Sequence, residues 1–374
     1  MTAANDAGQD VLTVEELRVN FHTFAGEVKA LDGVDLSVKR GEILGLVGES
    51  GSGKSVTALS IEGLLPLNAE VVGGRVLLEG RDVLKERPEE LRSARLTKMA
   101  MVFQDPLTYL NPVLTIGTQI LEILEADRRD FGPVVVAARM AELDKAAQSR
   151  QLSEKEAKEG ERLRRLGSRE SLGGREFKRL ATGYAVAILR QVRLPEPERI
   201  FKAYPFELSG GMRQRAIIAM ALVRRPALLI ADEITTALDV TVQAQILKLL
   251  RELKAQIEAS ILLITHDLAV VAEVCDRVAV MYAGNIVEVA TVEELFNKPL
   301  HPYTQGLLAA IPRPDTAKGE LTSIKGSVPN LIYPPSGCRF HPRCPKVFAR
   351  CPTAKPPLVE ARPGHFVECF LYGG

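Results

Sequence analysis

Residues 48–55 read GESGSGKS and fit the pattern G-x-x-x-x-G-K-[ST]. An apolar segment, ILGLV at 43–47, comes directly before them, and a run with helical character, VTALSIEGLL at 56–65, follows. A strand, a glycine-rich loop and a helix in this order form the phosphate loop of nucleotide-binding proteins. The alternative is a glycine-rich turn without a ligand. Because the flanking segments favour the phosphate loop, we expect a nucleotide site here.

The residue types in this loop suit a polyanionic ligand. Gly48, Gly51 and Gly53 let the backbone wrap phosphate groups, because glycine has no Cβ atom to obstruct the approach. Lys54 is expected to reach the β- and γ-phosphates, and the Ser55 hydroxyl is expected to bind Mg²⁺. The nucleotide contacts predicted in this segment are Gly48, Ser50, Gly51, Ser52, Gly53, Lys54, Ser55 and Val56.

An acidic pair, Asp232 and Glu233, follows the apolar segment ALLIA at 227–231. In an open α/β sheet the carboxyl end of such a strand lies beside the phosphate loop. We therefore expect Asp232 to hold Mg²⁺ through water and Glu233 to polarise the water that attacks the nucleotide. A solvated turn is the alternative for the pair taken alone, but the presence of a phosphate loop favours the catalytic interpretation.

Apolar strands that alternate with helical patterns predict an α/β fold with a parallel core. Alternation over residues 277–290 predicts a β-hairpin that turns at Gly284 and Asn285. The other predicted strands are 11–47 in three segments, 75–84, 98–103, 227–231 and 261–265.

Two regions have a helical pattern, 115–201 and 240–258. Within the first, Ser153 and Glu156 have the spacing of a capping box that opens a helix, and Gly167 is expected to end that helix. Proline becomes frequent after residue 299, so the remainder of the chain is expected to be rich in loops.

The composition is that of an ordinary globular protein. Of 374 residues, 25% are charged and 46% are hydrophobic, and the formal net charge is +1. A nucleic-acid binder usually carries a basic excess, so nucleic acid is not an expected partner. No apolar run reaches the length of about eighteen residues that a membrane-spanning helix needs. The first residues, MTAANDAGQD, do not resemble a signal peptide, and we expect a protein kept in the cytosol.

Further motifs follow the phosphate loop in a fixed order. Gln104 follows a strand in MVFQDP, ELSGGMRQR occupies 207–215, TALD occupies 236–239 after the acidic pair, and His266 lies in LLITHD. The ordered set resembles the ATP-binding-cassette ATPases over about residues 11–312. The resemblance implies a P-loop NTPase with a parallel-sheet core, an antiparallel β subdomain and a helical subdomain.

The LSGG segment implies a second nucleotide contact. Ser209, Gly210 and Gly211 form an anion site at a helix start. In the family that site completes the nucleotide site of the opposite subunit, so that two ATP molecules are buried between two head-to-tail subunits. By the same resemblance, Asp239 contacts the phosphate loop of the partner.

The resemblance also implies roles for three other residues. Gln104 would contact Mg²⁺ and the attacking water, His266 would contact the γ-phosphate, and Phe24 would stack on adenine. The expected catalytic set is thus Lys54, Gln104, Glu233 and His266. One departure from the family is Ile234, which follows the acidic pair where proline is usual.

Longer phrases resemble one branch of the family, the dipeptide/oligopeptide and nickel importer ATPases. They are FQDPLTYLNPVLTIGTQI, AYPFELSGGMRQRAIIAMAL, ADEITTALDVTVQAQIL and HPYTQGLLAAIP. The implied partners are two transmembrane permease subunits, a sister ATPase subunit and an extracytoplasmic solute-binding protein. The implied location is peripheral, on the cytoplasmic face of the inner membrane. Peptide, nickel and oligosaccharide cargo all remain open.

The predicted domains are a nucleotide-binding domain, 10–300, and a C-terminal extension, 301–374. The helical subdomain is expected at about 105–222. It contains a charged insertion at about 128–185, which is either a solvated helical hairpin or an extra contact to the permease or a regulator.

Four of the five cysteines crowd into the extension. By count, four thiolates suit Zn²⁺ or a [4Fe–4S] cluster equally, and the short pair spacings of zinc ribbons are missing. Resemblance to the D-type ATPases of the branch implies [4Fe–4S], with zinc and unligated thiols as alternatives. Cys275 is expected to be a buried small hydrophobe. The four expected cluster ligands are Cys338, Cys344, Cys351 and Cys369.

Two other functions compete with transport. One is a cassette protein that acts on DNA or ribosomes, but the single cassette and the near-zero net charge disfavour it. The other is a zinc-dependent interaction module with a cassette that does not hydrolyse ATP, which the intact acidic pair disfavours.

Overall fold

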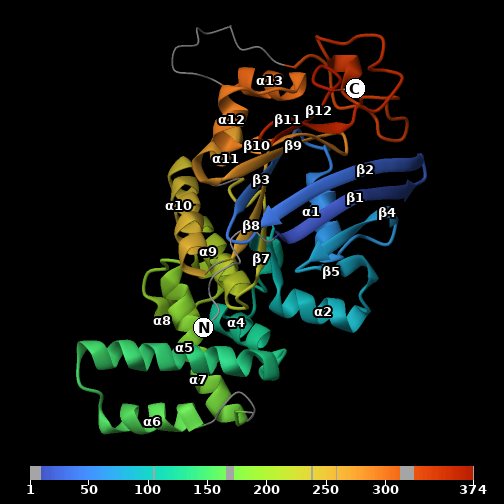
Figure 1. The fold of residues 1–374 in the computed structure, drawn as a ribbon. Coiled ribbons are helices and arrows are strands. Elements are labelled where there is room, and N and C mark those ends of the chain that lie inside the picture. The colour runs from blue at the N-terminus through green and yellow to red at the C-terminus, as the bar shows by residue number, and fades with distance from the viewer. Residues whose placement is uncertain are drawn as a thin grey trace. The chain divides into compact units, whose positions relative to one another are not determined.

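The computed structural model describes residues 10–103, 106–165, 172–236, 239–257, 259–311 and 324–373 (Figure 1). The chain forms two compact units. The first consists of Met1–Arg92, Ala227–Glu233 and Leu247–Gly374, and the second of Ser93–Pro226 and Ile234–Ile246. The boundary predicted near residue 300 lies inside the first unit and stays a prediction.

A sheet in the first unit carries the strands that precede the predicted site. Its strands run in the order β11-β12-β10-β9-β3-β8-β7, and β9, β3, β8 and β7 are parallel. Nearly every residue of these four strands is buried, which is typical of a parallel sheet covered on both faces. The predicted parallel core is therefore confirmed. The strands are β3 Ile43–Val47, β7 Leu228–Asp232, β8 Ser260–Thr265 and β9 Arg277–Tyr282.

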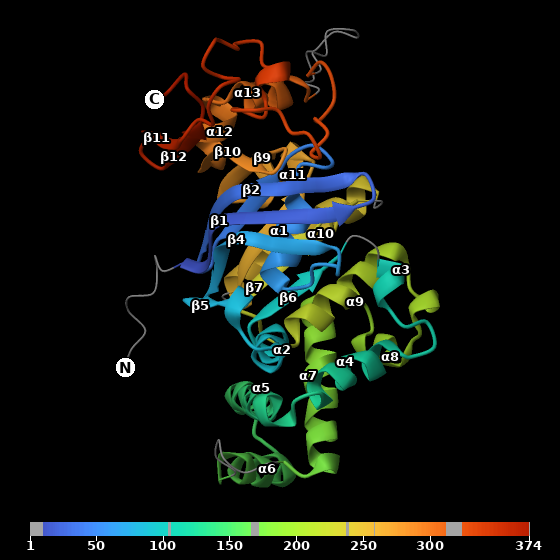
Figure 2. The ribbon, with the colours of Figure 1, turned by 90° about the vertical axis from the view of Figure 1, so that its right-hand side faces the viewer.

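A separate antiparallel sheet in the same unit has the order β2-β1-β4-β5 (Figure 2). Its strands are β1 Asp10–Thr23, β2 Gly26–Lys39, β4 Ala69–Leu78 and β5 Arg81–Asp82. The strand predicted over 75–84 is wrong in its second half. Glu79 and Gly80 both have positive φ, 48° and 78°, so the chain turns after β4. A short 3-10 helix, Val83–Lys85, then follows β5.

The predicted hairpin forms, but its turn lies one residue earlier than expected. Strand β9 ends at Tyr282, and β10, Asn285–Thr291, begins with Asn285 paired to Tyr282. The turn residues are Ala283 and Gly284, whose φ values of 47° and 85° suit a tight hairpin turn. The side-chain amide of Asn285 donates to the Asp32 carbonyl at 2.9 Å, which helps to hold this residue in the strand.

The other helices of the first unit follow or connect these strands. They are α1 Lys54–Glu62, α11 Leu268–Val274, α12 Val292–Asn297 and α13 Pro302–Ala309. The extension adds a 3-10 helix, His341–Arg343, and two strands, β11 Leu358–Arg362 and β12 His365–Glu368. Two helices, α2 Pro88–Thr97 and α10 Val240–Ile257, contribute residues to both units.

The second unit is mainly helical. None of the helices within the described residues combines the length and the apolar character needed to cross a bilayer. The elements of the second unit are β6 Met99–Val102, α3 Pro106–Tyr109, α4 Ile116–Glu125, α5 Arg128–Ser149, α6 Glu154–Arg165, α7 Gly174–Gln191, α8 Pro197–Lys202, a 3-10 helix Pro205–Glu207, and α9 Gly210–Leu222.

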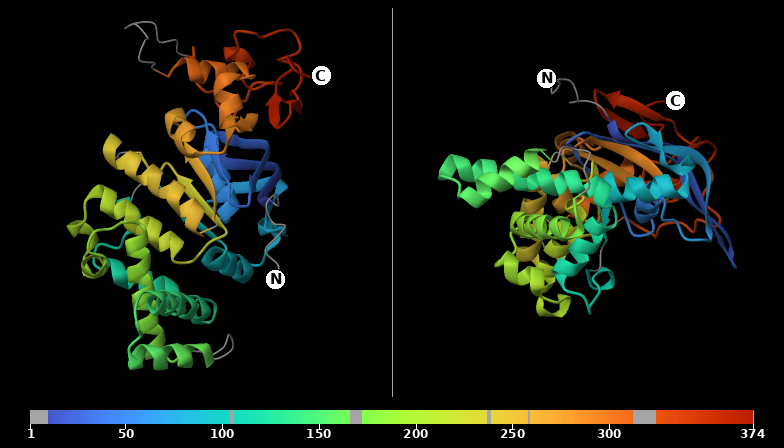
Figure 3. Two further views of the ribbon diagram at one scale, coloured as in Figure 1. Left: turned by 60° about the vertical axis from the view of Figure 1, so that its left-hand side comes forward. Right: turned by 90° about the horizontal axis from the view of Figure 1, so that it is seen from below.

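The charged insertion forms helices that lie side by side, with α5 beside both α6 and α7 (Figure 3). The predicted capping box is confirmed. The Glu156 amide donates to Ser153 Oγ at 3.3 Å, and the Ser153 amide donates to the Glu156 carboxylate at 2.9 Å. Gly167 lies outside the described residues. Glu159 of α6 pairs with Arg139 of α5 at 3.0 Å and with Arg179 of α7 at 2.6 Å, so charged groups join the three helices.

The C-terminal extension is joined to the sheet through a buried carboxylate. Glu288 of β10 is fully buried. Its oxygens accept from the Leu300 amide at 2.7 Å, from the His301 amide at 2.9 Å and from His365 Nε2 of β12 at 2.7 Å. Three donors that converge on one buried carboxylate replace the water lost on folding, and they fix β12 and the start of α13 to the core.

Replacing Glu288 by Gln is expected to lower the free energy of unfolding by about 3 kcal/mol. The amide has a single acceptor oxygen, so at least one of the three buried donors loses its partner. Denaturant unfolding of the two proteins measures the difference. Glu293→Gln, at an exposed position on α12, is the control and is expected to change stability little. Equal midpoints for the Glu288 variant and the parent would contradict the role given to this carboxylate.

Candidate functional site

The predicted phosphate loop, residues 48–55, connects β3 to α1 and passes very close to β9. A Cβ atom at Gly48 would lie 2.1 Å from the Met281 carbonyl oxygen, so only glycine fits there. Gly53 has a φ of 108°, in the region that favours glycine, and it is the N-cap of α1. The loop therefore has the sharp curvature that lets backbone N–H groups face an anion.

Lys54 is the first residue of α1 and is buried. Its ammonium group turns back over the loop and donates to the Gly48 carbonyl at 2.8 Å and to the Glu49 carbonyl at 3.1 Å. Burial lowers the pKa of Lys54 from its ordinary value, and the nearby carboxylates of Glu233 and Asp232 oppose that shift. The positive charge thus lies inside the loop and beside the acidic pair.

Asp232 ends β7 and is buried beside Ser55, whose hydroxyl hydrogen bonds to it. Burial raises the pKa of Asp232; the Ser55 hydrogen bond and the charge of Lys54 oppose the shift, and Glu233 adds to it. One oxygen of Asp232 has no hydrogen-bond partner within the described residues, and neither has the buried hydroxyl of Ser52. Unsatisfied oxygens beside a buried ammonium group fit a magnesium–phosphate ligand.

Glu233 and His266 lie together at the carboxyl ends of β7 and β8. His266 Nδ1 is 3.3 Å from Glu233 Oε1, and the Glu233 amide donates to the Ile264 carbonyl at 2.9 Å. Glu233 has a φ of 48°, an uncommon backbone conformation for this residue type and one that often occurs at functional sites. The carboxylate is mostly buried and the imidazole is half exposed, so both border a space that solvent reaches.

The LSGG segment lies in the second unit. Ser209 is the N-cap of α9, and its hydroxyl accepts from the Met212 amide at 3.4 Å. A Cβ atom at Gly211 would lie 2.7 Å from a methyl group of Val242, so glycine allows α9 to pack against the start of α10. Asp239 is exposed and its carboxylate accepts from the Val242 amide at 2.9 Å, which caps α10.

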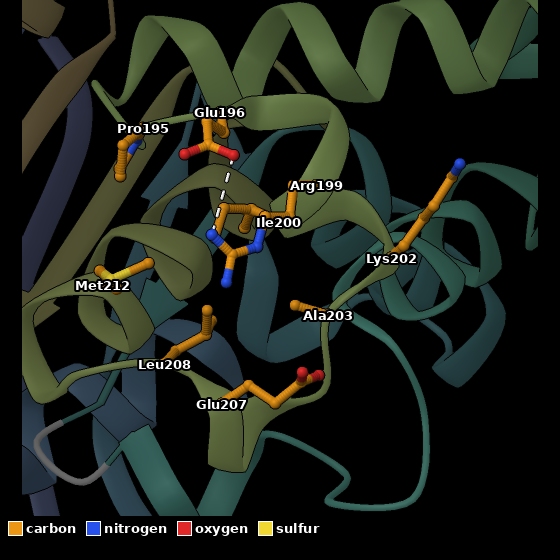
Figure 4. Close-up of a pocket in the computed structure, with 9 residues that line it drawn as sticks. All are labelled: Pro195, Glu196, Arg199, Ile200, Lys202, Ala203, Glu207, Leu208 and Met212. Carbon is orange, nitrogen blue, oxygen red and sulfur yellow. Dashed lines mark ion pairs between the residues drawn. The ribbon is translucent and has the colours of Figure 1, made fainter.

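A cavity of about 500 Å³ lies beside α9 in the second unit (Figure 4). It opens between α8 and the turn that leads into the LSGG segment, and Glu196 and Arg199 pair across 3.7 Å at its edge. No sequence motif indicated this cavity, because its wall combines helix ends and a turn. The lining residues are Pro195, Glu196, Arg199, Ile200, Lys202, Ala203, Glu207, Leu208 and Met212.

The remaining predicted nucleotide contacts have different surroundings. Gln104 lies outside the described residues. Phe24 lies in the turn between β1 and β2 and is fully exposed, so its predicted stacking on adenine stays a prediction. Gly51 has a φ of 78°, and a Cβ atom at this position would meet no other atom within 4 Å. Ile234, the residue that follows the acidic pair, is buried.

The four cysteines of the extension line one cavity, together with Phe340, Phe348 and Phe370. Among the residues the structure describes, no three or more His, Cys, Asp or Glu side chains are grouped closely enough to hold one metal ion. Burial raises the thiol pKa of Cys338 to about 12 and also raises those of Cys344 and Cys369. Cys275 packs against the hydrophobic core of the first unit, and burial raises its thiol pKa as well.

Comparison with known proteins assigns this chain to a family. The model of the ABC transporter family matches residues 31–236, and the model of the oligopeptide/dipeptide transporter C-terminal region matches residues 287–351. The oligopeptide transport ATP-binding protein AppD of Bacillus subtilis is 44% identical, covering 97% of both chains. The oligopeptide transport ATP-binding protein OppD of Escherichia coli is 42% identical, covering 98% of this chain and 95% of its own.

Solved structures support the same fold. A dimeric bacterial ABC transporter cassette has a TM-score of 0.56 at 23% identity, and the match covers 75% of this chain and 98% of that one. The family models and the near-complete alignments carry the assignment beyond the fold. The chain therefore belongs to the ABC transporter family, in the branch of the oligopeptide and dipeptide transport ATP-binding proteins.

Proposed function

We propose that this chain is the ATPase subunit that powers import of dipeptides or oligopeptides through a membrane permease complex. The observation that carries the proposal is the extent of the similarity. It covers the cassette and the extension alike, and residues 287–351 match the region named for oligopeptide/dipeptide transporters. The proposed partners are two permease subunits, a sister ATPase subunit and a solute-binding protein outside the membrane, with this chain peripheral on the cytoplasmic face.

The proposed chemistry is in-line attack of water on the γ-phosphate of ATP. Glu233 orients and polarises that water, and His266, whose ring lies against Glu233, contacts the γ-phosphate. Lys54 neutralises the charge that spreads over the phosphate oxygens in the transition state. Ser55 and Asp232 would hold Mg²⁺, which would offset the negative charge of the phosphate groups. Gln104 is the proposed further contact to Mg²⁺ and water.

We propose that closure requires two ATPase subunits. Ser209, Gly210 and Gly211 at the start of α9 face the nucleotide held by the partner, and Asp239 contacts the partner's phosphate loop. The support is the helix start itself: four N–H groups at the N-terminus of an α-helix have no partner within the helix and attract an anion. ATP hydrolysis would then reopen the pair and reset the permease.

Transport in vesicles tests the proposed cargo. The complex, reconstituted with its solute-binding protein, is expected to accumulate a labelled di- or oligopeptide only when ATP is present on the cytoplasmic side. Nickel ions and an oligosaccharide serve as competing cargo in parallel vesicles. Accumulation of either of these, without peptide uptake, would overturn the proposed cargo and leave the ATPase assignment in place.

We further propose that the cysteines of the extension hold a [4Fe–4S] cluster. A single Zn²⁺ needs four ligands about 2.3 Å from one point when they are thiolates, whereas a cluster separates its cysteine ligands by its own width. The four cysteines line one small cavity and supply the four thiolates that a cluster takes. Cys338, Cys344, Cys351 and Cys369 are the proposed ligands.

Protein purified without oxygen is expected to be brown and to contain iron and acid-labile sulfide in equal amounts. Cys344→Ser is expected to lose most of both, because a cluster with three thiolate ligands is held less firmly. Cys275→Ser, which changes a cysteine outside this cavity, is the control and should keep its iron. Stoichiometric zinc in colourless protein would refute the cluster.

A further inference from the structure

Glu49, the second residue of the phosphate loop, is bound by the C-terminal extension. Its amide donates to the hydroxyl of Tyr303, on α13, at 3.0 Å. Its carboxylate pairs with the guanidinium of Arg343, in the 3-10 helix of the extension, through two contacts of 3.0 and 3.3 Å. Its carbonyl accepts from Lys54 at 3.1 Å. Main chain and side chain of one loop residue are thus both held, and the same residue contacts the lysine of the motif.

Arg343 is well placed to hold this loop, because its side chain is only 7% exposed. It donates to the carbonyls of Lys325 at 3.0 Å and Gly326 at 3.2 Å. Its guanidinium carbon lies over the ring of Tyr282, 5.7 Å from the ring centroid. A planar guanidinium that makes a two-point contact with a carboxylate fixes both the distance and the orientation of its partner.

Tyr303 provides the second connection between the extension and the loop. It is fully buried. The centroid of its ring lies 4.6 Å from that of Tyr282 and 5.3 Å from that of Phe340. These rings belong to the hydrophobic core shared by β9, α13 and the extension. The loop is therefore attached to a packed core rather than to a mobile surface segment.

We propose that Arg343 of the extension is a positioning residue for nucleotide binding, acting through Glu49 to hold the phosphate loop in its binding conformation. A loop held in place before the ligand arrives loses less conformational entropy on binding. The extension thereby contributes to ATP affinity without touching ATP, in addition to any role of its cysteines.

The test measures binding of MgADP to the purified full-length chain by titration calorimetry. Arg343→Gln is expected to weaken MgADP binding about tenfold, which corresponds to about 1.4 kcal/mol. Glu49→Gln, which leaves the extension unchanged, is expected to weaken it by a similar factor. The double variant is expected to be no weaker than either single variant. ATPase assays on the assembled complex should show a raised KM with kcat little changed.

Arg339→Gln is the matched control. Arg339 is also in the extension and is equally buried. It binds the Ala283 carbonyl, the Lys29 carbonyl at 3.2 Å and Asp32 at 3.3 Å, none of which belongs to the phosphate loop. It is expected to lower the thermal unfolding midpoint as Arg343→Gln does, yet to leave MgADP affinity within about twofold. Equal loss of affinity in the Arg339 variant, unchanged affinity in the Glu49 and Arg343 variants, or additive effects in the double variant would each overturn the proposal.

Discussion

Replacing Glu233 by Gln is expected to lower ATP turnover of the assembled complex about a hundredfold or more. The amide is nearly the same size as the carboxylate, so it preserves the contact with His266, but it cannot accept a proton from the attacking water. ATP binding does not require that proton transfer. The variant is therefore expected to bind MgATP about as well as the parent and to retain it.

Two measurements separate these effects: phosphate release under saturating ATP, and retention of labelled ATP after rapid gel filtration. Glu273→Gln is the control, because Glu273 is an exposed carboxylate of the same unit that pairs with Arg251 at 2.9 Å, outside the site. Turnover within a few-fold of the parent in the Glu233 variant would show that another group positions the water.

Lys54→Ala is expected to reduce turnover by a similar factor, about a hundredfold or more, for a different reason. Lys54 supplies the buried positive charge inside the phosphate loop, and its removal leaves Asp232 and Glu233 without that counter-charge. The variant loses ground-state binding of the phosphates as well as stabilisation of the transition state. Both KM for ATP and kcat are thus expected to change.

A steady-state titration with ATP, together with MgADP calorimetry, distinguishes this result from that of Glu233→Gln. The control is Lys298→Ala, which removes an exposed lysine that pairs with Glu294 at 3.5 Å on α12. Normal MgADP affinity in the Lys54 variant would contradict the place assigned to this ammonium group.

Local patterns predicted the strands that precede the site residues well. Apolar segments followed by Gly48, Asp232 and His266 indicated three strand ends, and parallel pairing of β3 with β8 and of β8 with β7 brings the acidic pair and His266 to the same edge as the loop. Such strands carry their own signal because both faces are buried. The Ser153–Glu156 capping box was predictable for the same reason: both partners lie within one helical turn.

Turns were predicted less well. The hairpin after β9 turns at Ala283 and Gly284, although Gly284 and Asn285 have the more typical residue types. The competing contact of Asn285 with Asp32 is 253 residues away in sequence, and no local pattern contains it. Glu79 likewise adopts a positive φ that its residue type does not indicate.

Sequence by itself determined the family of this chain, the phosphate loop, the acidic pair and the alternation of strands and helices, since each depends on residues close together in the chain. Tertiary structure alone decided that Arg343 and Tyr303 hold Glu49 from positions 294 and 254 residues away. The reason is physical. A contact between distant segments depends on how the sheets and the extension pack, and neither partner carries a local mark of the other.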